Sequence, residues 1–110
     1  MVVNIKRTDV IVPKWKYNDK QKESEQIKVN VKFFNTLEYE DFIDRSTGNL
    51  DTKTMFMKSI ISVENLSIVE DGKEKKIESG KDILETPGLE QLFTELFTTY
   101  NKLSAIDKKK

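Results

Sequence analysis

The residues best suited to chemistry are four acidic side chains gathered near the middle of the chain, Glu38, Glu40, Asp41 and Asp44. Two carboxyl groups in different environments can act as acid and base, and several converging oxygens can hold a hard cation. Glu40 and Asp44 are four residues apart and would share one helix face. Nothing in the sequence marks a pocket around them, and residues 41–51 lack the ligand spacing of an EF-hand loop. We therefore interpret the cluster as a solvated helix face.

Composition removes most other catalytic groups. The chain of 110 residues has no cysteine and no histidine, so it lacks thiolate ligands, imidazole ligands and the commonest general base. A serine nucleophile would need a neighbouring base, and no Ser-x-x-Lys element occurs. Four glycines, at positions 48, 72, 80 and 88, form no phosphate-binding loop. We expect no catalytic residues, no metal and no cofactor, and hence no enzyme.

Cations and aromatic rings alternate in Lys14–Tyr17. Together with Lys28 and Lys32 on a neighbouring strand, Trp15 and Tyr17 could form the kind of basic, aromatic face that binds single-stranded nucleic acid. The same alternation is typical of a solvated strand, and the net charge of zero is unlike that of most nucleic-acid binders. Nucleic-acid binding is therefore retained only as the alternative function.

Charge is distributed unevenly along the chain. Residues 1–33 carry eight basic and four acidic side chains, a net of +4, whereas residues 34–72 carry three basic and eight acidic ones, a net of −5. Such asymmetry can steer association with a complementary surface, although ordinary solvated surface is the favoured interpretation. Apolar runs are four residues or shorter, so we expect neither a membrane-spanning helix nor a signal peptide.

The first third of the chain has strand patterns. Apolar residues alternate with polar ones in 27–33, as in a half-buried strand. Residues 10–17 predict its antiparallel partner, at an edge or with a break because Pro13 cannot donate to a ladder. Residues 18–26 contain no large apolar side chain and predict a mobile connecting loop.

Two helices are expected next. Thr36 is the predicted cap of a short one, with Tyr39, Phe42 and Ile43 on its buried face and a turn at 46–49 after it. Asp51 caps the second, whose apolar positions near helical spacing are Met55, Phe56, Ile60 and Val63.

A β-hairpin is predicted over residues 64–78. Asp71-Gly72 favours a two-residue type I′ turn, because both central positions of that turn need positive φ. Centring the turn there places Glu70 opposite Lys73, and Leu66 opposite Ile77.

The C-terminal part is helical. Ser79 can cap one helical turn at 79–84, and Thr86-Pro87 is predicted to start a long helix. Its stripe is the clearest periodic pattern in the chain, with apolar residues at 89, 92, 93, 96, 97, 100 and 103. We expect this apolar stripe mainly to pack in the core, but part of it could bind a partner protein. The predicted fold is thus a single α+β domain at 1–106, with a long helix packed on the sheet and a basic tail at 107–110.

From about Thr54 to Leu103 the chain resembles the tail assembly chaperones of long-tailed bacteriophages. The shared features are a helix with Phe56 and Ile60, the strand Val63–Ile68, the turn Asp71–Lys73, and Pro87 ahead of a Leu92-Phe93 helix. The resemblance implies a protein without catalysis in the host cytoplasm, which binds the tape measure protein or tail-tube subunits before the tube polymerises. A connector or tail subunit retained in the virion is the other reading.

We expect function through protein contacts. The candidate partner-binding residues are Trp15, Tyr17, Phe93, Phe97 and Tyr100. Large aromatic side chains at these positions are suited to anchoring an interface.

Overall fold

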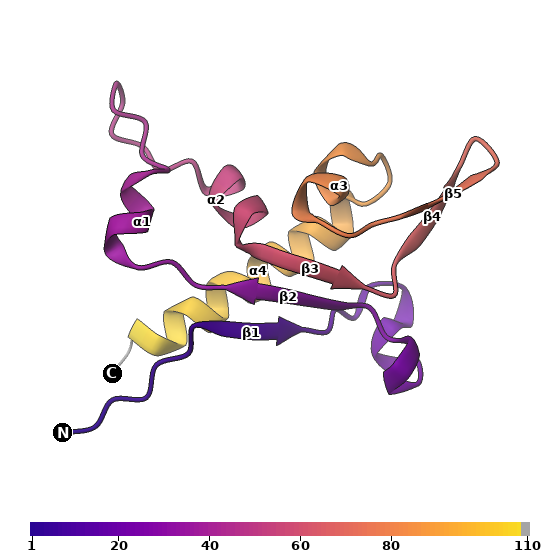
Figure 1. Ribbon diagram of the computed structural model, residues 1–110, viewed down its shortest axis with the longest axis horizontal. Coiled ribbons are helices and arrows are strands. Elements are labelled where there is room, and N and C mark those ends of the chain that lie inside the picture. Colours follow the sequence, from indigo (N-terminus) through magenta and orange to yellow (C-terminus); the bar gives the residue numbers. More distant parts are fainter. Residues whose placement is uncertain (109–110) are drawn as a thin grey trace.

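The computed structural model describes residues 1–108 and has an α+β fold, as the sequence predicts (Figure 1). A three-stranded antiparallel sheet, a separate two-stranded hairpin and four α-helices make up most of it. In chain order the elements are β1 (Thr8–Ile11), the 3-10 segments η1 (Trp15–Lys20) and η2 (Glu23–Glu25), β2 (Lys28–Lys32), α1 (Thr36–Glu40), α2 (Thr52–Ser59), β3 (Ile60–Glu64), β4 (Ser67–Glu70), β5 (Lys73–Lys76), α3 (Gly80–Glu85) and α4 (Glu90–Lys108).

The sheet has the order β1-β2-β3, with β2 in the centre. Val29 pairs with Ile11 on one side and with Val63 on the other, and all three side chains are buried on one face. The register between β2 and β3 skips from Ser62 to Ile60, which leaves Ile61 as an extra residue, 54 % exposed. The bulge therefore removes one apolar side chain from the core face.

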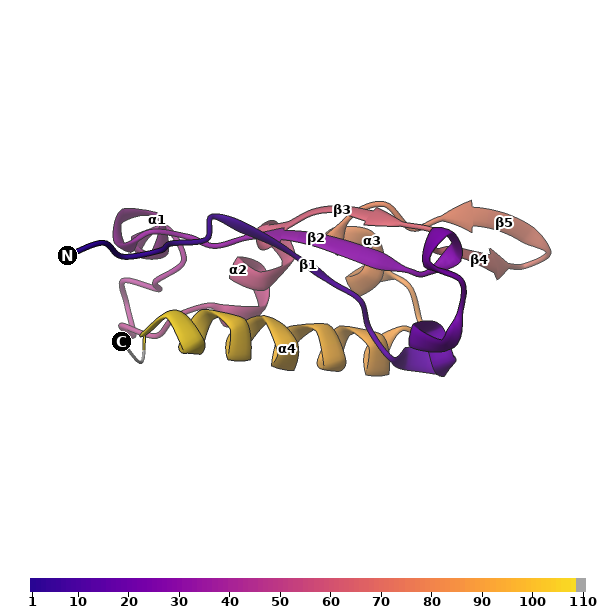
Figure 2. The same ribbon diagram turned by 90° about the horizontal axis from the view of Figure 1, so that it is seen from below.

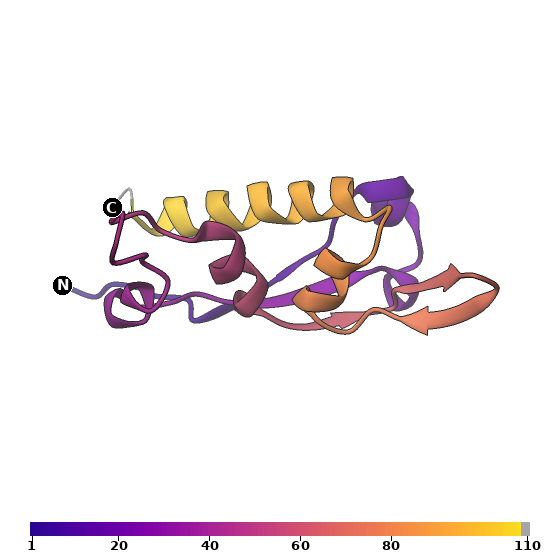
Figure 3. The ribbon, with the colours of Figure 1, turned by 90° about the horizontal axis from the view of Figure 1, so that it is seen from above.

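The long helix α4 covers that face of the sheet (Figure 2). Leu92 and Leu96 are fully buried and belong to one core cluster with Val29, Val31 and Phe56. Burial of each apolar side chain of this size contributes roughly 1.5–3 kcal/mol, so the contact between α4 and the sheet is a major source of stability. Helices α2 and α3 lie on the same side of the sheet as α4 (Figure 3).

The hairpin β4–β5 projects beyond the sheet (Figures 1 and 3). Asp71 and Gly72 both have positive φ, 52° and 78°, and Glu70 pairs with Lys73 as predicted. Leu66 accepts a hydrogen bond from the backbone N–H of Ile77, which confirms the predicted pairing of these two residues.

Several predicted boundaries were wrong. Asn35, and not Thr36, caps α1, because its side chain accepts from the Glu38 N–H while Glu38 accepts from the Asn35 N–H. The helix ends at Glu40, so Ile43 lies beyond it, where it forms an isolated antiparallel bridge with Leu50 and is 40 % exposed instead of buried.

The predicted helix after Asp51 is divided between two elements. Asp51 caps α2 as expected, but α2 ends at Ser59, and Ile60 and Val63 belong to β3. Positions three apart are buried here because the bulge at Ile61 shifts the strand's alternation. The strand predicted to continue from Val63 to Val69 is broken at Asn65, which has a φ of 63°.

The start of the last helix also differs from the prediction. Pro87 and Gly88 form a turn, with Gly88 at a φ of 97°, and α4 begins at Glu90. It continues to Lys108, into the stretch predicted as a basic tail; Lys109 and Lys110 lie outside the described residues.

Candidate functional site

Two of the four clustered acidic residues accept hydrogen bonds from residues close in the chain. The Glu38 carboxylate accepts from the Asn35 N–H at 3.0 Å, and Asp44 accepts from the hydroxyl and N–H of Ser46 at 2.6 and 2.9 Å. The Ser46 bonds hold the pKa of Asp44 below its ordinary value. Among residues 1–108, no three acidic side chains converge as a metal site would require.

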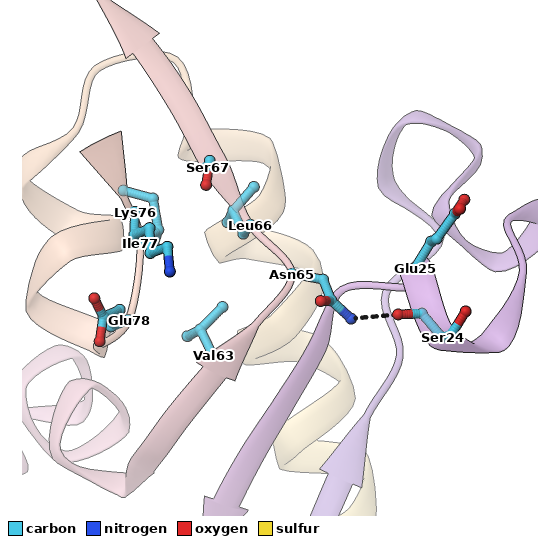
Figure 4. A pocket seen from close by; sticks show the side chains of 9 residues that line it. All are labelled: Ser24, Glu25, Val63, Asn65, Leu66, Ser67, Lys76, Ile77 and Glu78. Carbon is cyan, nitrogen blue, oxygen red and sulfur yellow. Dashed lines mark hydrogen bonds between the residues drawn. The ribbon is translucent and has the colours of Figure 1, made fainter. Parts of the chain in front are cut away.

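An open groove of about 540 Å³ lies at the base of the hairpin (Figure 4). Val63, Leu66 and Ile77 form its apolar floor, and Lys76 and Glu78 stand on one wall. Asn65 closes its other side by donating to the carbonyls of Ser24 and Gln26 at 3.1 and 2.9 Å. The bonds of Asn65 fix η2 to the start of the hairpin, so the groove is primarily a structural junction.

The segment around Trp15 has an unusual backbone. It was predicted to be a strand, but residues 15–20 form η1, in which Lys16 and Tyr17 have left-handed φ values of 51° and 62°. A non-glycine residue in this region costs of order 1–3 kcal/mol and persists only where the surroundings enforce it. Such strain often occurs at binding sites.

Asn18 enforces this conformation. It is 4 % exposed, and its side chain donates to the carbonyls of Pro13 and Ile27 and accepts from the Ile27 N–H at 2.6 Å. The segment 18–26, predicted to be a mobile loop, is instead two 3-10 turns tied to the start of β2. The Asn18 side chain therefore ties the η1 turn to the residues that follow β1 and precede β2.

A second anchor comes from α4. The Glu95 carboxylate accepts from the Lys14 N–H at 2.5 Å, and η1 lies beside the first turns of α4 (Figure 2). Trp15 packs partly against the core, and the Lys16 ammonium lies 5.2 Å from the centroid of its ring. The next residue, Tyr17, is 78 % exposed. A rigid turn therefore presents one aromatic side chain to solvent.

The basic sheet face considered for the alternative, nucleic-acid-binding function is not formed. Lys28 and Lys32 alternate with the buried Val29 and Val31, so they lie on the face opposite α4, whereas η1 packs beside α4. Lys28 pairs with Glu23 at 3.8 Å, and Lys32 lies 5.5 Å from the centroid of the Phe34 ring.

The other candidate aromatics surround Phe56. Phe93 and Phe97 are half-buried with ring centroids 5.3 and 5.4 Å from that of Phe56. Tyr100 is 1 % exposed and donates to the Lys32 carbonyl at 3.0 Å; burial raises its pKa to about 12. Its ring is sealed in the core, so of the five candidates only Tyr17 is fully presented to solvent.

Sequence reasoning missed the two residues that hold the turn, Asn18 and Glu95. Asn18 stands in a polar stretch that has no apolar periodicity, and Glu95 is one of several acids along α4. Their partners are nine and 81 residues away in the chain. The single local signal was the unusual Trp15-Lys16-Tyr17 run.

No protein-family model matches the chain, and no curated protein or solved structure shows significant similarity to it. No helix within residues 1–108 is both long enough and apolar enough to cross a membrane.

Proposed function

We propose that this chain is a protein-binding domain that acts without catalysis in the assembly of long bacteriophage tails. In that role it would bind the tape measure protein or the tail-tube subunits in the host cytoplasm. The resemblance of residues 54–103 to tail assembly chaperones supports the assembly part of the proposal. The geometry of the η1 turn supports the protein-binding part.

The observation that carries the proposal is that Tyr17 is exposed on a turn whose backbone is held by hydrogen bonds. Its side chain is 78 % exposed while the adjacent Asn18 is 4 % exposed and fully hydrogen-bonded. Tyrosine and tryptophan are enriched among residues that dominate binding energy, and a pre-ordered loop loses less entropy when it binds. An exposed aromatic ring on a fixed turn is thus well suited to anchor a protein interface.

The proposal predicts that genes for a tail-tube protein and a tape measure protein lie beside the gene for this chain. Co-expression with those two proteins, followed by size-exclusion chromatography with light scattering, should give a stoichiometric complex with at least one of them. Deletion of the gene from the phage should yield heads without tails. Failure of both results would contradict the proposal.

Analysis of purified virions separates the two assembly roles. A chaperone-like protein should be absent from finished particles, whereas a connector or tail subunit should be present in fixed copy number. Stoichiometric presence in the virion would therefore replace the chaperone-like role with a structural one.

A further inference from the structure

The lysines around Tyr17 determine what kind of partner the turn suits. Residues 14–22 carry four basic side chains and one acidic side chain, a net of +3, and all five are exposed. The four are Lys14, Lys16, Lys20 and Lys22. Within residues 1–108, none of their ammonium groups forms a salt bridge; the ion pairs there involve Lys6, Lys28 and Lys81.

This arrangement is an exposed aromatic side chain flanked by lysines that form no salt bridge within the part of the chain that the structure describes. Exposed charges at a rim speed association with an oppositely charged partner and exclude like-charged ones. The anchor itself supplies contact area at low entropic cost, because the tyrosine side chain has few rotatable bonds. Carboxylates are the complementary groups.

Nucleic acid suits the turn less well. Single-strand platforms stack successive bases on several exposed rings, but here the Trp15 ring packs partly on the core and has the Lys16 ammonium over it. Tyr17 is therefore the one fully exposed aromatic ring in this turn.

We propose that the Lys14–Lys22 turn binds an acidic, extended segment of a partner protein, with Tyr17 as the anchor and the four lysines as its charged rim. The inference rests on the proposed protein-binding function and specifies the partner's chemistry. It needs no rearrangement of the domain, because Asn18 and Glu95 already hold the turn.

The chain has one tryptophan, and it lies in this turn, so intrinsic fluorescence reports directly on the site. The probe is a short peptide of Asp and Glu interspersed with Leu. Binding should change the Trp15 emission, since carboxylates draw Lys16 away from the ring, and should weaken steeply as salt rises and screens the charges. A reversed-charge peptide with Lys in place of Asp and Glu should not bind.

Variants locate the contact. Tyr17→Ala should weaken peptide binding about 10-fold or more, as loss of an interface anchor does, while Tyr17→Phe keeps the ring and should retain most of the affinity. Val69→Ala and Lys73→Ala, in the projecting hairpin, are the matched controls and should bind as the parent does. Thermal melts of each variant establish that it is folded.

Three binding results and one self-association result would overturn the inference. The binding results are equal binding of the reversed-charge peptide, an unchanged affinity in folded Tyr17→Ala, and tighter binding of oligothymidylate through Tyr17 and Lys16. Self-association that requires Tyr17, with no peptide binding, would also overturn it by making a second copy the occupant.

The inference and the proposed function can fail separately. If the acidic peptide binds at Tyr17 but the tail-tube and tape measure proteins do not bind the chain, the proposed assembly role is wrong and the inferred peptide-binding site is still supported. If those proteins bind equally well to Tyr17→Ala and at high salt, the assembly role stands and the site is wrong.

Discussion

Two turns in this molecule place two consecutive non-helical residues at positive φ, and they do so with very different side chains. The hairpin turn uses Asp71 and Gly72, at 52° and 78°. The η1 turn uses Lys16 and Tyr17, at 51° and 62°. Glycine adopts this region at no steric cost and Asp tolerates it, whereas Lys and Tyr are strained there.

The difference lies in what fixes each turn. Asp71-Gly72 forms a type I′ turn from local preference, between two short strands that add little burial of their own. Lys16 and Tyr17 are held against their preference by the buried hydrogen bonds of Asn18 and by the Glu95 carboxylate on Lys14. The hairpin turn connects two strands, while the η1 turn presents a side chain.

The largest loss of stability should come from removing the Asn18 side chain, whose hydrogen bonds hold the η1 turn. Asn18→Ala leaves the Ile27 N–H and the carbonyls of Pro13 and Ile27 without their partners, and each unsatisfied buried group costs about 1–3 kcal/mol. We expect a loss of about 3 kcal/mol in the free energy of unfolding, measured by urea denaturation. Asn101→Ala, at an exposed site on α4, is the control and should change little. Equal unfolding midpoints for the two variants would mean that the Asn18 hydrogen bonds do not hold the η1 turn.

The hairpin turn should be the next most sensitive. A Cβ at Gly72 would meet no atom within 4 Å, so Gly72→Val tests backbone conformation alone. A β-branched residue at a φ of 78° should cost about 1–2 kcal/mol in denaturant melts. Gly72→Asn is the matched variant and should be close to neutral, because Asn tolerates positive φ. If both substitutions leave the midpoint unchanged, local preference does not fix this turn.

A smaller loss is expected from the anchor on α4. Glu95→Ala removes the acceptor of the Lys14 N–H and should lower the free energy of unfolding by about 1 kcal/mol, since the bond is partly solvated. It should also change the Trp15 emission, because the turn loosens. Gln91→Ala, exposed on the same helix, should do neither. An unaltered emission spectrum in Glu95→Ala would mean that Asn18 alone holds the turn.

The two turns also show what the sequence can and cannot reveal. The hairpin was predictable down to the pairing of Glu70 with Lys73, because turn type and register are both local. The α2 cap at Asp51 and the apolar stripe of α4 were predictable for the same reason. Lys16 and Tyr17 follow no local preference, and Asn18 acts on residues five and nine positions away.

Tertiary packing explains the other differences. Ile60 and Val63 fit a helical spacing, but as members of β3 they complete the buried face beside Val29 and Val31. Trp15 and Tyr17 alternate with lysines as a strand would, yet Pro13 is buried and the turn to Ile27 follows at once. The periodic patterns alone were enough to predict the fold class, whereas the η1 site depends on contacts between residues distant in the sequence and could not be predicted from them.

Tyr17→Gly is the most direct test of the claim that the η1 turn presents Tyr17 for binding at the cost of backbone strain. Glycine relieves the left-handed strain, although it also adds freedom to the unfolded chain. The free energy of unfolding should therefore stay within about 0.5 kcal/mol of the parent or rise, and binding of the acidic peptide should fall about 10-fold or more. The result that would contradict the account is a destabilised Tyr17→Gly variant that still binds the peptide as the parent does.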